Sequence, residues 1–155
     1  MVASQFIERR RGDRLGLILF GSQAYLQAPL TFDSKTVNRL LDESAIGLAG
    51  ERTAIGDAIG LAIKRLDLQS DNSRVLILMT DGANTAGEVT PLKAAQIAAQ
   101  RELRIYTIGI GADEQITSTW FGLRRSNPSA QLDEETLREI ARLSGGRYFR
   151  ARDSE

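Results

Sequence analysis

The chain has 155 residues, 42% of them apolar and 26% charged, which is enough for one globular domain with a continuous core. Its 20 lysines and arginines balance 20 aspartates and glutamates, so no net charge favours nucleic acid as a partner. The absence of cysteine and histidine excludes disulfides, thiolate nucleophiles, Cys/His zinc sites and histidine bases, so any metal must be held by oxygen. No apolar stretch approaches the roughly 18 residues of a membrane span, and we expect no direct membrane insertion by this chain.

The first part of the chain predicts a helix, a hairpin and a second helix. An amphipathic segment at 2–11 should end at Gly12. Two β-like runs at 13–21 and 23–30 meet at Gly21 and Ser22, which favours an antiparallel hairpin, and Pro29 marks its second strand as an edge. A short helix follows, capped by Asp33 or Ser34. A glycine-containing loop then leads to Thr53.

From Ile55 onward, helices and strands alternate. Ile55 to Leu66 has the spacing of a core-facing helix, and Gly56 and Gly60 would allow it to approach a sheet closely. The run at 74–80 is uninterruptedly apolar, as expected of a parallel strand covered by helices on both faces. A helix after Thr90 and Pro91, a strand at 104–111 and a loop at 113–131 are expected next. The last elements expected are a helix capped by Asp133, with a hydrophobic staple between Leu132 and Leu137, and a strand at 147–151. This order predicts a single three-layer α/β domain with a mostly parallel sheet and one antiparallel edge strand.

Asp81 follows the apolar strand directly, in the stretch "LILMTDGANT". In an open α/β sheet the carboxyl ends of the strands form the ligand-binding edge, so Asp81 is a candidate ligand there. An Asp-Gly pair is also a common turn, which leaves a structural role open.

Thr53 is the second candidate, because the alternation brings it to the same edge as Asp81. A threonine before a helix is also an ordinary N-cap, and both roles could coexist on one hydroxyl. A carboxylate and a hydroxyl together suit a hard cation, Mg²⁺ or Mn²⁺, with water in the remaining positions and one position open for a partner's carboxylate.

Five segments together resemble a von Willebrand factor A domain, and in particular its bacterial Bat aerotolerance branch: "RLGLILFGSQAYLQAPLT", "GERTAIGDAIGLAI", "RVLILMTDGANTAG", "RIYTIGIG" and "LREIARLSGGRYFRA". The resemblance implies a Rossmann-like fold and a protein-interaction module with a metal-ion-dependent adhesion site. It further implies a parent protein anchored in the bacterial membrane, with this domain on the periplasmic side, and an association with MoxR-type ATPases.

In this family the adhesion site comprises an Asp-x-Ser-x-Ser loop after the first strand, a threonine, and an aspartate after the fourth strand. Thr53 and Asp81 match the last two, but no Asp-x-Ser-x-Ser occurs in the sequence. We therefore expect an N-terminally truncated domain over residues 1–155, without the central strand that the family places between the strands at 14–20 and 74–80. Without that central strand, the two flanking strands could pair with each other, a neighbouring molecule could supply a segment in a strand-swapped dimer, or the chain could aggregate. Of these outcomes we expect a homo-oligomer. With two protein ligands, metal affinity should be weaker than millimolar.

Two alternative functions stay open. Trp120 and Phe121, in the loop at 113–131, could anchor a protein partner, which would make the domain a metal-independent scaffold or assembly factor. They could equally pack over a helix end. Asp81 also resembles the second aspartate of haloacid-dehalogenase phosphatases, but Met79 stands where that chemistry needs a nucleophilic aspartate. We therefore expect no enzyme activity.

Overall fold

The computed structural model describes residues 2–44, 52–67, 73–111, 115–119, 122–126 and 133–151. Within these ranges the helices are α1 (Val2–Arg9), α2 (Ser34–Asp42), α3 (Ile55–Leu66), α4 (Pro91–Gln100) and α5 (Glu134–Ser144). The strands are β1 (Leu15–Phe20), β2 (Ala24–Thr31), β3 (Arg74–Thr80), β4 (Leu103–Ile110), β5 (Gln115–Thr119), β6 (Gly122–Ser126) and β7 (Tyr148–Ala151). The α/β fold and most of the expected elements are confirmed.

The helix ends follow the capping chemistry that the sequence predicts. Asp33 and Asp133 accept hydrogen bonds from the backbone N–H groups three residues further on, and Thr90 does the same for α4, which begins at Pro91. Gly145 ends α5 in the left-handed conformation, at a φ of 78°. The proposed staple partner Leu132 lies outside the described residues.

The strands form separate sheets rather than one. β1 and β2 pair as the expected antiparallel hairpin, and β3, β4 and β7 form a parallel sheet in that order. Within the described part of the chain, β1 is hydrogen-bonded only to β2, and β3 only to β4. The other edges of β1 and β3 therefore have no strand partner among the described residues.

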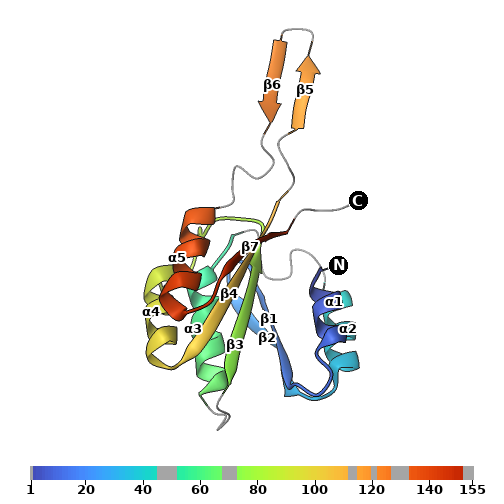
Figure 1. Cartoon of the computed structure of the whole chain (residues 1–155), viewed down its shortest axis with the longest axis vertical. Helices are drawn as coiled ribbons and strands as arrows, with labels where there is room; N and C mark the ends of the chain where they lie inside the picture. Colours follow the sequence, from blue (N-terminus) through green and yellow to red (C-terminus); the bar gives the residue numbers. More distant parts are fainter. Residues whose placement is uncertain are drawn as a thin grey trace.

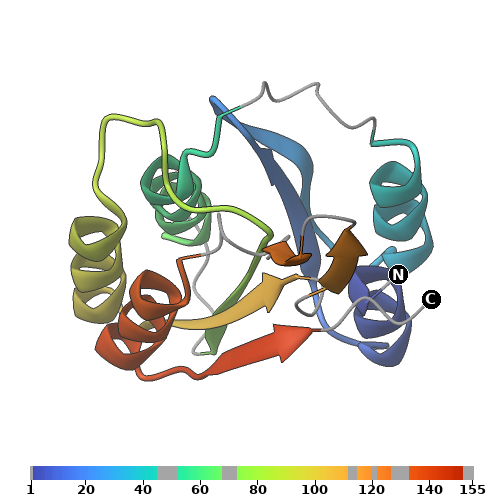
Figure 2. The same cartoon turned by 90° about the horizontal axis from the view of Figure 1, so that it is seen from above.

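Helices cover the parallel sheet on one face. α3, α4 and α5 lie together on this face, and α1 and α2 lie on the other side of the molecule (Figure 2). The main core contains Ile59, Leu78 and Ile105 among its buried residues. On the opposite face, Val75 and Phe149 are 47% and 50% exposed, so the expectation that helices cover β3 on both faces is wrong for the described residues. The reason is that α1 and α2 pack on β1 and β2 instead.

Two glycines allow backbone segments to meet. A Cβ on Gly56 would lie 1.9 Å from the carbonyl oxygen of Val89, and one on Gly146 would lie 1.8 Å from that of Ile105. Gly56 therefore lets α3 approach the loop before α4, rather than the sheet as expected. Gly60 meets nothing within 4 Å, so its expected role in close packing is wrong.

The segment at 113–131, expected to be a loop, contains the antiparallel pair β5 and β6. This hairpin projects away from the rest of the domain (Figure 1). The sequences of the two strands, "QITST" and "GLRRS", have no continuous apolar pattern, so the local sequence does not predict this hairpin. Trp120 and Phe121, which follow β5 in the sequence, are outside the described residues.

Candidate functional site

Thr53 ties the start of α3 to the loop at residues 81–90, which follows β3. The Thr53 backbone N–H donates to the Thr85 hydroxyl (2.9 Å), and the Thr53 carbonyl accepts from the N–H groups of Thr85 (2.8 Å) and Ala86 (3.1 Å). The backbone of Thr53 is thus bonded on both sides to the loop that carries Asp81. The alternation of strands and helices brings these two segments to the same edge, as expected.

The helix α3 is capped by a residue from this loop and not by Thr53. Ala54 occupies the N-cap position without a side-chain bond, and Asn84 Oδ1 accepts a hydrogen bond from the Ile55 N–H (2.8 Å). The alternative that Thr53 acts as the N-cap is therefore wrong. Among the described residues, the Thr53 hydroxyl has no hydrogen-bond partner and is available to a ligand.

Asp81 and Thr53 lie close together. Thr53 Oγ1 is 3.5 Å from the position that a Cβ on Gly82 would occupy, so the hydroxyl lies beside the residue that follows Asp81. The Thr80 side chain bonds the Gly82 backbone at 3.2 Å and shapes this turn. Asp81 is exposed, and its carboxylate makes no hydrogen bond or ion pair to any described residue. We refer to the Thr53 hydroxyl and the Asp81 carboxylate together as the strand-end pair.

Asp57 holds the far end of the same loop. Its carboxylate accepts hydrogen bonds from the N–H groups of Glu88 (3.0 and 3.2 Å) and Val89 (3.0 Å). Gly87 has a φ of +101°, and a Cβ there would lie 2.9 Å from Asp57 Cγ. Asp57 is thus committed to the loop backbone. The sequence places an aspartate in the first turn of α3, but neither this partner nor the capping role of Asn84 can be recognised without the fold.

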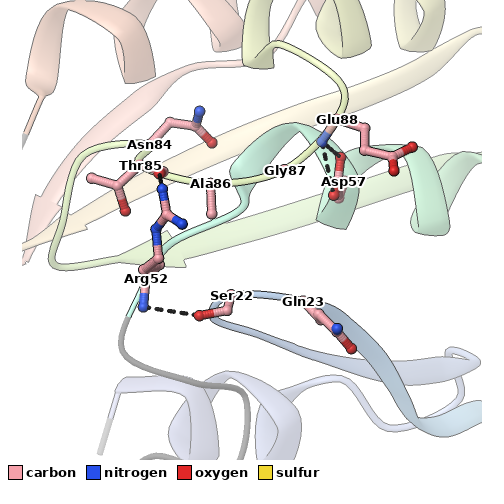
Figure 3. Close-up of a pocket in the computed structure, with 9 residues that line it drawn as sticks. All are labelled: Ser22, Gln23, Arg52, Asp57, Asn84, Thr85, Ala86, Gly87 and Glu88. Atoms are coloured by element: carbon pink, nitrogen blue, oxygen red, sulfur yellow. Dashed lines mark hydrogen bonds between the residues drawn. The ribbon is translucent and has the colours of Figure 1, made fainter.

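A polar hollow of about 850 Å³ lies between the β1–β2 turn and the 81–90 loop, and neither Thr53 nor Asp81 is among the residues that line it. Its lining residues are Ser22, Gln23, Arg52, Asp57, Asn84, Thr85, Ala86, Gly87 and Glu88. Figure 3 shows that the β1–β2 turn borders it on one side and the 81–90 loop on the other, with Arg52 between them. The Arg52 guanidinium donates to the Thr85 carbonyl (3.0 Å), and the Arg52 backbone N–H donates to Ser22 Oγ (3.2 Å).

The strand-end pair offers a hard cation only two protein ligands, one hydroxyl and one carboxylate. Mg²⁺ requires about six oxygens in near-octahedral geometry, so four or so would have to come from water or from other groups. Among the described residues, no three His, Cys, Asp or Glu side chains lie together as a metal-binding group. The donor chemistry suits Mg²⁺ or Mn²⁺, but the pair alone would hold either ion weakly.

None of the helices in the described part of the chain is both long and apolar enough to cross a membrane.

Comparisons with known proteins identify the fold. The model of the von Willebrand factor type A domain matches residues 1–155. The structure of an aerotolerance-related membrane protein from Bacteroides fragilis is 25% identical, with 97% of this chain and 77% of that chain covered and a TM-score of 0.78. BatB from Bacteroides thetaiotaomicron is 26% identical, with 99% and 78% covered and a TM-score of 0.76.

A membrane-spanning protein from Vibrio fischeri is more similar in sequence and less similar in structure. It is 52% identical, with 99% of this chain and 75% of that chain covered, but the TM-score is 0.51. The chain spans less than half the length of the curated relatives that it matches. Because the family model matches the chain over its whole length, the chain belongs to the von Willebrand factor type A domain family.

Proposed function

We propose that this domain binds a protein ligand at the strand-end pair, through Mg²⁺ or Mn²⁺ held by Thr53 and Asp81 together with groups that this sequence does not contain. Domains of this family generally mediate protein interactions. The observation that carries the proposal is the pair itself. The Thr53 hydroxyl lies beside Gly82, the residue that follows Asp81, on the side of a loop that Asn84 and Asp57 hold in place, and neither this hydroxyl nor the Asp81 carboxylate has a partner among the described residues.

The remaining ligands would come from an Asp-x-Ser-x-Ser loop, which is absent from the sequence. The family resemblance places the strand that leads to this loop between β1 and β3. The unpaired edges of these two strands support that position. A bound cation would supply an electrophilic position for a carboxylate of the partner. Thr53 and Asp81 would orient the cation, and no step of this function needs catalysis by the chain.

The cellular setting is proposed on the likeness to the Bacteroides proteins. One of these is an aerotolerance-related membrane protein and another is BatB. We propose that the parent of this domain is likewise anchored in the bacterial cytoplasmic membrane, displays the domain on the periplasmic side, and works with a MoxR-type ATPase in a stress or assembly system.

Paramagnetic broadening by Mn²⁺ tests where the cation binds. In ¹H–¹⁵N spectra of the labelled chain, Mn²⁺ should broaden the amides of Thr53, Gly82 and Asn84 before any others. Asp81→Asn should abolish this selective broadening, because it removes the only anionic ligand of the pair. Asp42→Asn, at an exposed carboxylate on α2, is the matched control and should leave it intact. Broadening that ignores Asp81→Asn, or that centres elsewhere, would overturn the proposal.

A second candidate function uses the β5–β6 hairpin. Its projection from the domain favours a metal-independent docking element, as in a scaffold or assembly factor (Figure 1). Here replacement of residues 115–126 by a short glycine-serine turn should abolish partner binding, whereas Asp81→Asn should not. The two variants thus separate the two functions in one binding assay with the same partner. Loss of binding in Asp81→Asn alone would refute the hairpin function.

A further inference from the structure

A second hollow, of about 370 Å³, lies where α5 ends and β7 begins. Its volume falls within the range of about 300–1,000 Å³ that is typical of ligand pockets. Arginines dominate its lining, and no acidic residue belongs to it. The lining residues are Arg138, Ala141 and Arg142 from α5, followed by Gly146, Arg147 and Tyr148. This hollow shares no residue with the strand-end pair, which follows the end of β3.

Arg147 is the arginine of this hollow that has no ion pair among the described residues. It is exposed. Arg138 pairs with Glu134 (2.7 Å), and Arg142 pairs with Glu139 (2.5 Å). The guanidinium groups at this place thus already bind carboxylates of α5. Over residues 134–151, four arginines against three glutamates leave an excess of one positive charge.

The Tyr148 hydroxyl is a second group without a partner. Its oxygen is buried and makes no hydrogen bond to any described residue, although the great majority of buried polar atoms are hydrogen-bonded. Burial raises the pKa of Tyr148 above its usual value of 10.0, while Arg138 acts in the opposite direction, so the hydroxyl is protonated at neutral pH. It is therefore a hydrogen-bond donor for which a ligand can supply the acceptor.

Arg138 connects the two unpartnered groups. Its guanidinium carbon lies 4.9 Å from the centroid of the Tyr148 ring, and its side chain is exposed. Glu134, its partner on α5, also pairs with Arg150. Arg138 can therefore turn from the ring toward an anion without leaving the Glu134 carboxylate unpaired.

We propose that this hollow binds a carboxylate from an acidic segment of a protein partner. Arg147 supplies the positive charge, and the Tyr148 hydroxyl donates a hydrogen bond to the same group. Arg138 turns toward the ligand, and Arg142 keeps its pair within α5. The single excess charge favours a carboxylate over a phosphate, whose charge of about −1.5 to −2 would exceed it. The proposal is independent of the strand-end pair and needs no cation.

Titration of a hexaglutamate peptide into the ¹⁵N-labelled chain, at fixed ionic strength and without divalent cations, tests this site. ¹H–¹⁵N spectra should show saturable shifts of the backbone amides of Gly146, Arg147 and Tyr148. Arg147→Gln should weaken binding roughly two- to fivefold, which corresponds to the loss of one exposed ion pair. Arg65→Gln, at an exposed arginine in the last turn of α3, is the matched control and should leave binding unchanged.

Tyr148→Phe separates a binding role of the hydroxyl from a structural one. The free chain loses no hydrogen bond to a described residue, so the stability of this variant in urea should equal or exceed that of the original chain. Its affinity for hexaglutamate should fall roughly two- to tenfold, because a hydrogen bond to a charged group is lost. Lower stability together with unchanged affinity would show that the hydroxyl serves the fold, and would overturn the proposal.

Hexaglutamine and inorganic phosphate are the comparison probes. Hexaglutamine should leave the three amides unshifted, and phosphate should bind more weakly than hexaglutamate at the same ionic strength. Shifts that Arg147→Gln leaves unaltered, an equal loss of affinity in Arg65→Gln, or tighter binding of phosphate would each overturn the proposal.

Discussion

Replacing Gly56 by alanine should destabilise the domain far more than the same change at Gly60, four residues along the same helix. A Cβ at position 56 would lie 1.9 Å from the Val89 oxygen, 2.7 Å from the Val89 carbonyl carbon and 2.9 Å from the Thr90 carbonyl carbon. All three are backbone atoms, so no side-chain rotation can relieve the overlap. At Gly60 the new methyl group would meet nothing within 4 Å.

The expected magnitudes follow from this difference. Overpacking costs about 1–3 kcal/mol, and overlap with backbone on this scale belongs at the upper end. The gain in helix propensity returns at most about 1 kcal/mol. We therefore expect Gly56→Ala to lower the free energy of unfolding by about 2 kcal/mol or more, and Gly60→Ala to raise it by up to about 1 kcal/mol. For a domain of this size these values correspond to a Tm lower by about 4–8 °C and higher by about 2–4 °C.

Urea unfolding followed by circular dichroism measures both variants under the same conditions. The Gly56 substitution should also shift the amide resonances of Asp81 and Asn84, because the loop before α4 must move away from α3. Equal stabilities of the two variants, or a Gly56→Ala variant more stable than the original chain, would refute the claim that α3 and this loop meet through Gly56.

Three further predictions concern the caps and the buried polar contact. Asn84→Ala should lower the free energy of unfolding by about 1 kcal/mol in urea titrations, because α3 loses the acceptor for its first N–H; an unchanged stability would contradict the cap. Thr107→Val should cost about 0.5–1.5 kcal/mol in the same assay, because the buried Thr107 hydroxyl donates to the Leu137 carbonyl at 2.8 Å and valine cannot form this hydrogen bond; a neutral effect would contradict it. The Thr136 hydroxyl and N–H hold the pKa of Asp133 below its usual value of 3.8, so this stabilisation is present above that pH and lost as the pH falls through the folded-state pKa. The original chain should therefore exceed Asp133→Asn in free energy of unfolding by roughly 0.3–1 kcal/mol at pH 7, and this difference should shrink as the pH falls below 3.8; a difference independent of pH would contradict the assignment.

The local elements could be predicted from the sequence because each has its own signals. Asp33, Thr90 and Asp133 each precede a helix and bond its first turn, and Gly145 adopts the left-handed conformation that ends α5. The apolar runs of β3 and β4 likewise predict their parallel pairing. These features depend on residues within a few positions of one another, which a sequence displays directly.

The features that depend on distant segments could not be predicted. Asn84 caps a helix that begins 29 positions earlier in the sequence, and Asp57 bonds the backbone of Glu88 and Val89. The sequence leaves open that Thr53 is the N-cap, because a threonine directly before a helix often takes that role, and it gives no sign that Asn84 does so instead. The position of Asp81 at the strand end could be predicted from the alternation of elements, but not that Thr53 keeps its hydroxyl uncommitted among the described residues.

The central claim is that Thr53 and Asp81 are the part of a cation site that this chain carries. The most direct measurement is titration of Mn²⁺ into the chain, with the free ion followed by electron paramagnetic resonance, for the original sequence, Asp81→Ala and the control Asp42→Ala. We predict a dissociation constant above about 1 mM, weaker again in Asp81→Ala and unchanged in Asp42→Ala. Binding that Asp81→Ala leaves unaltered, or saturable binding well below a millimolar, would contradict the account.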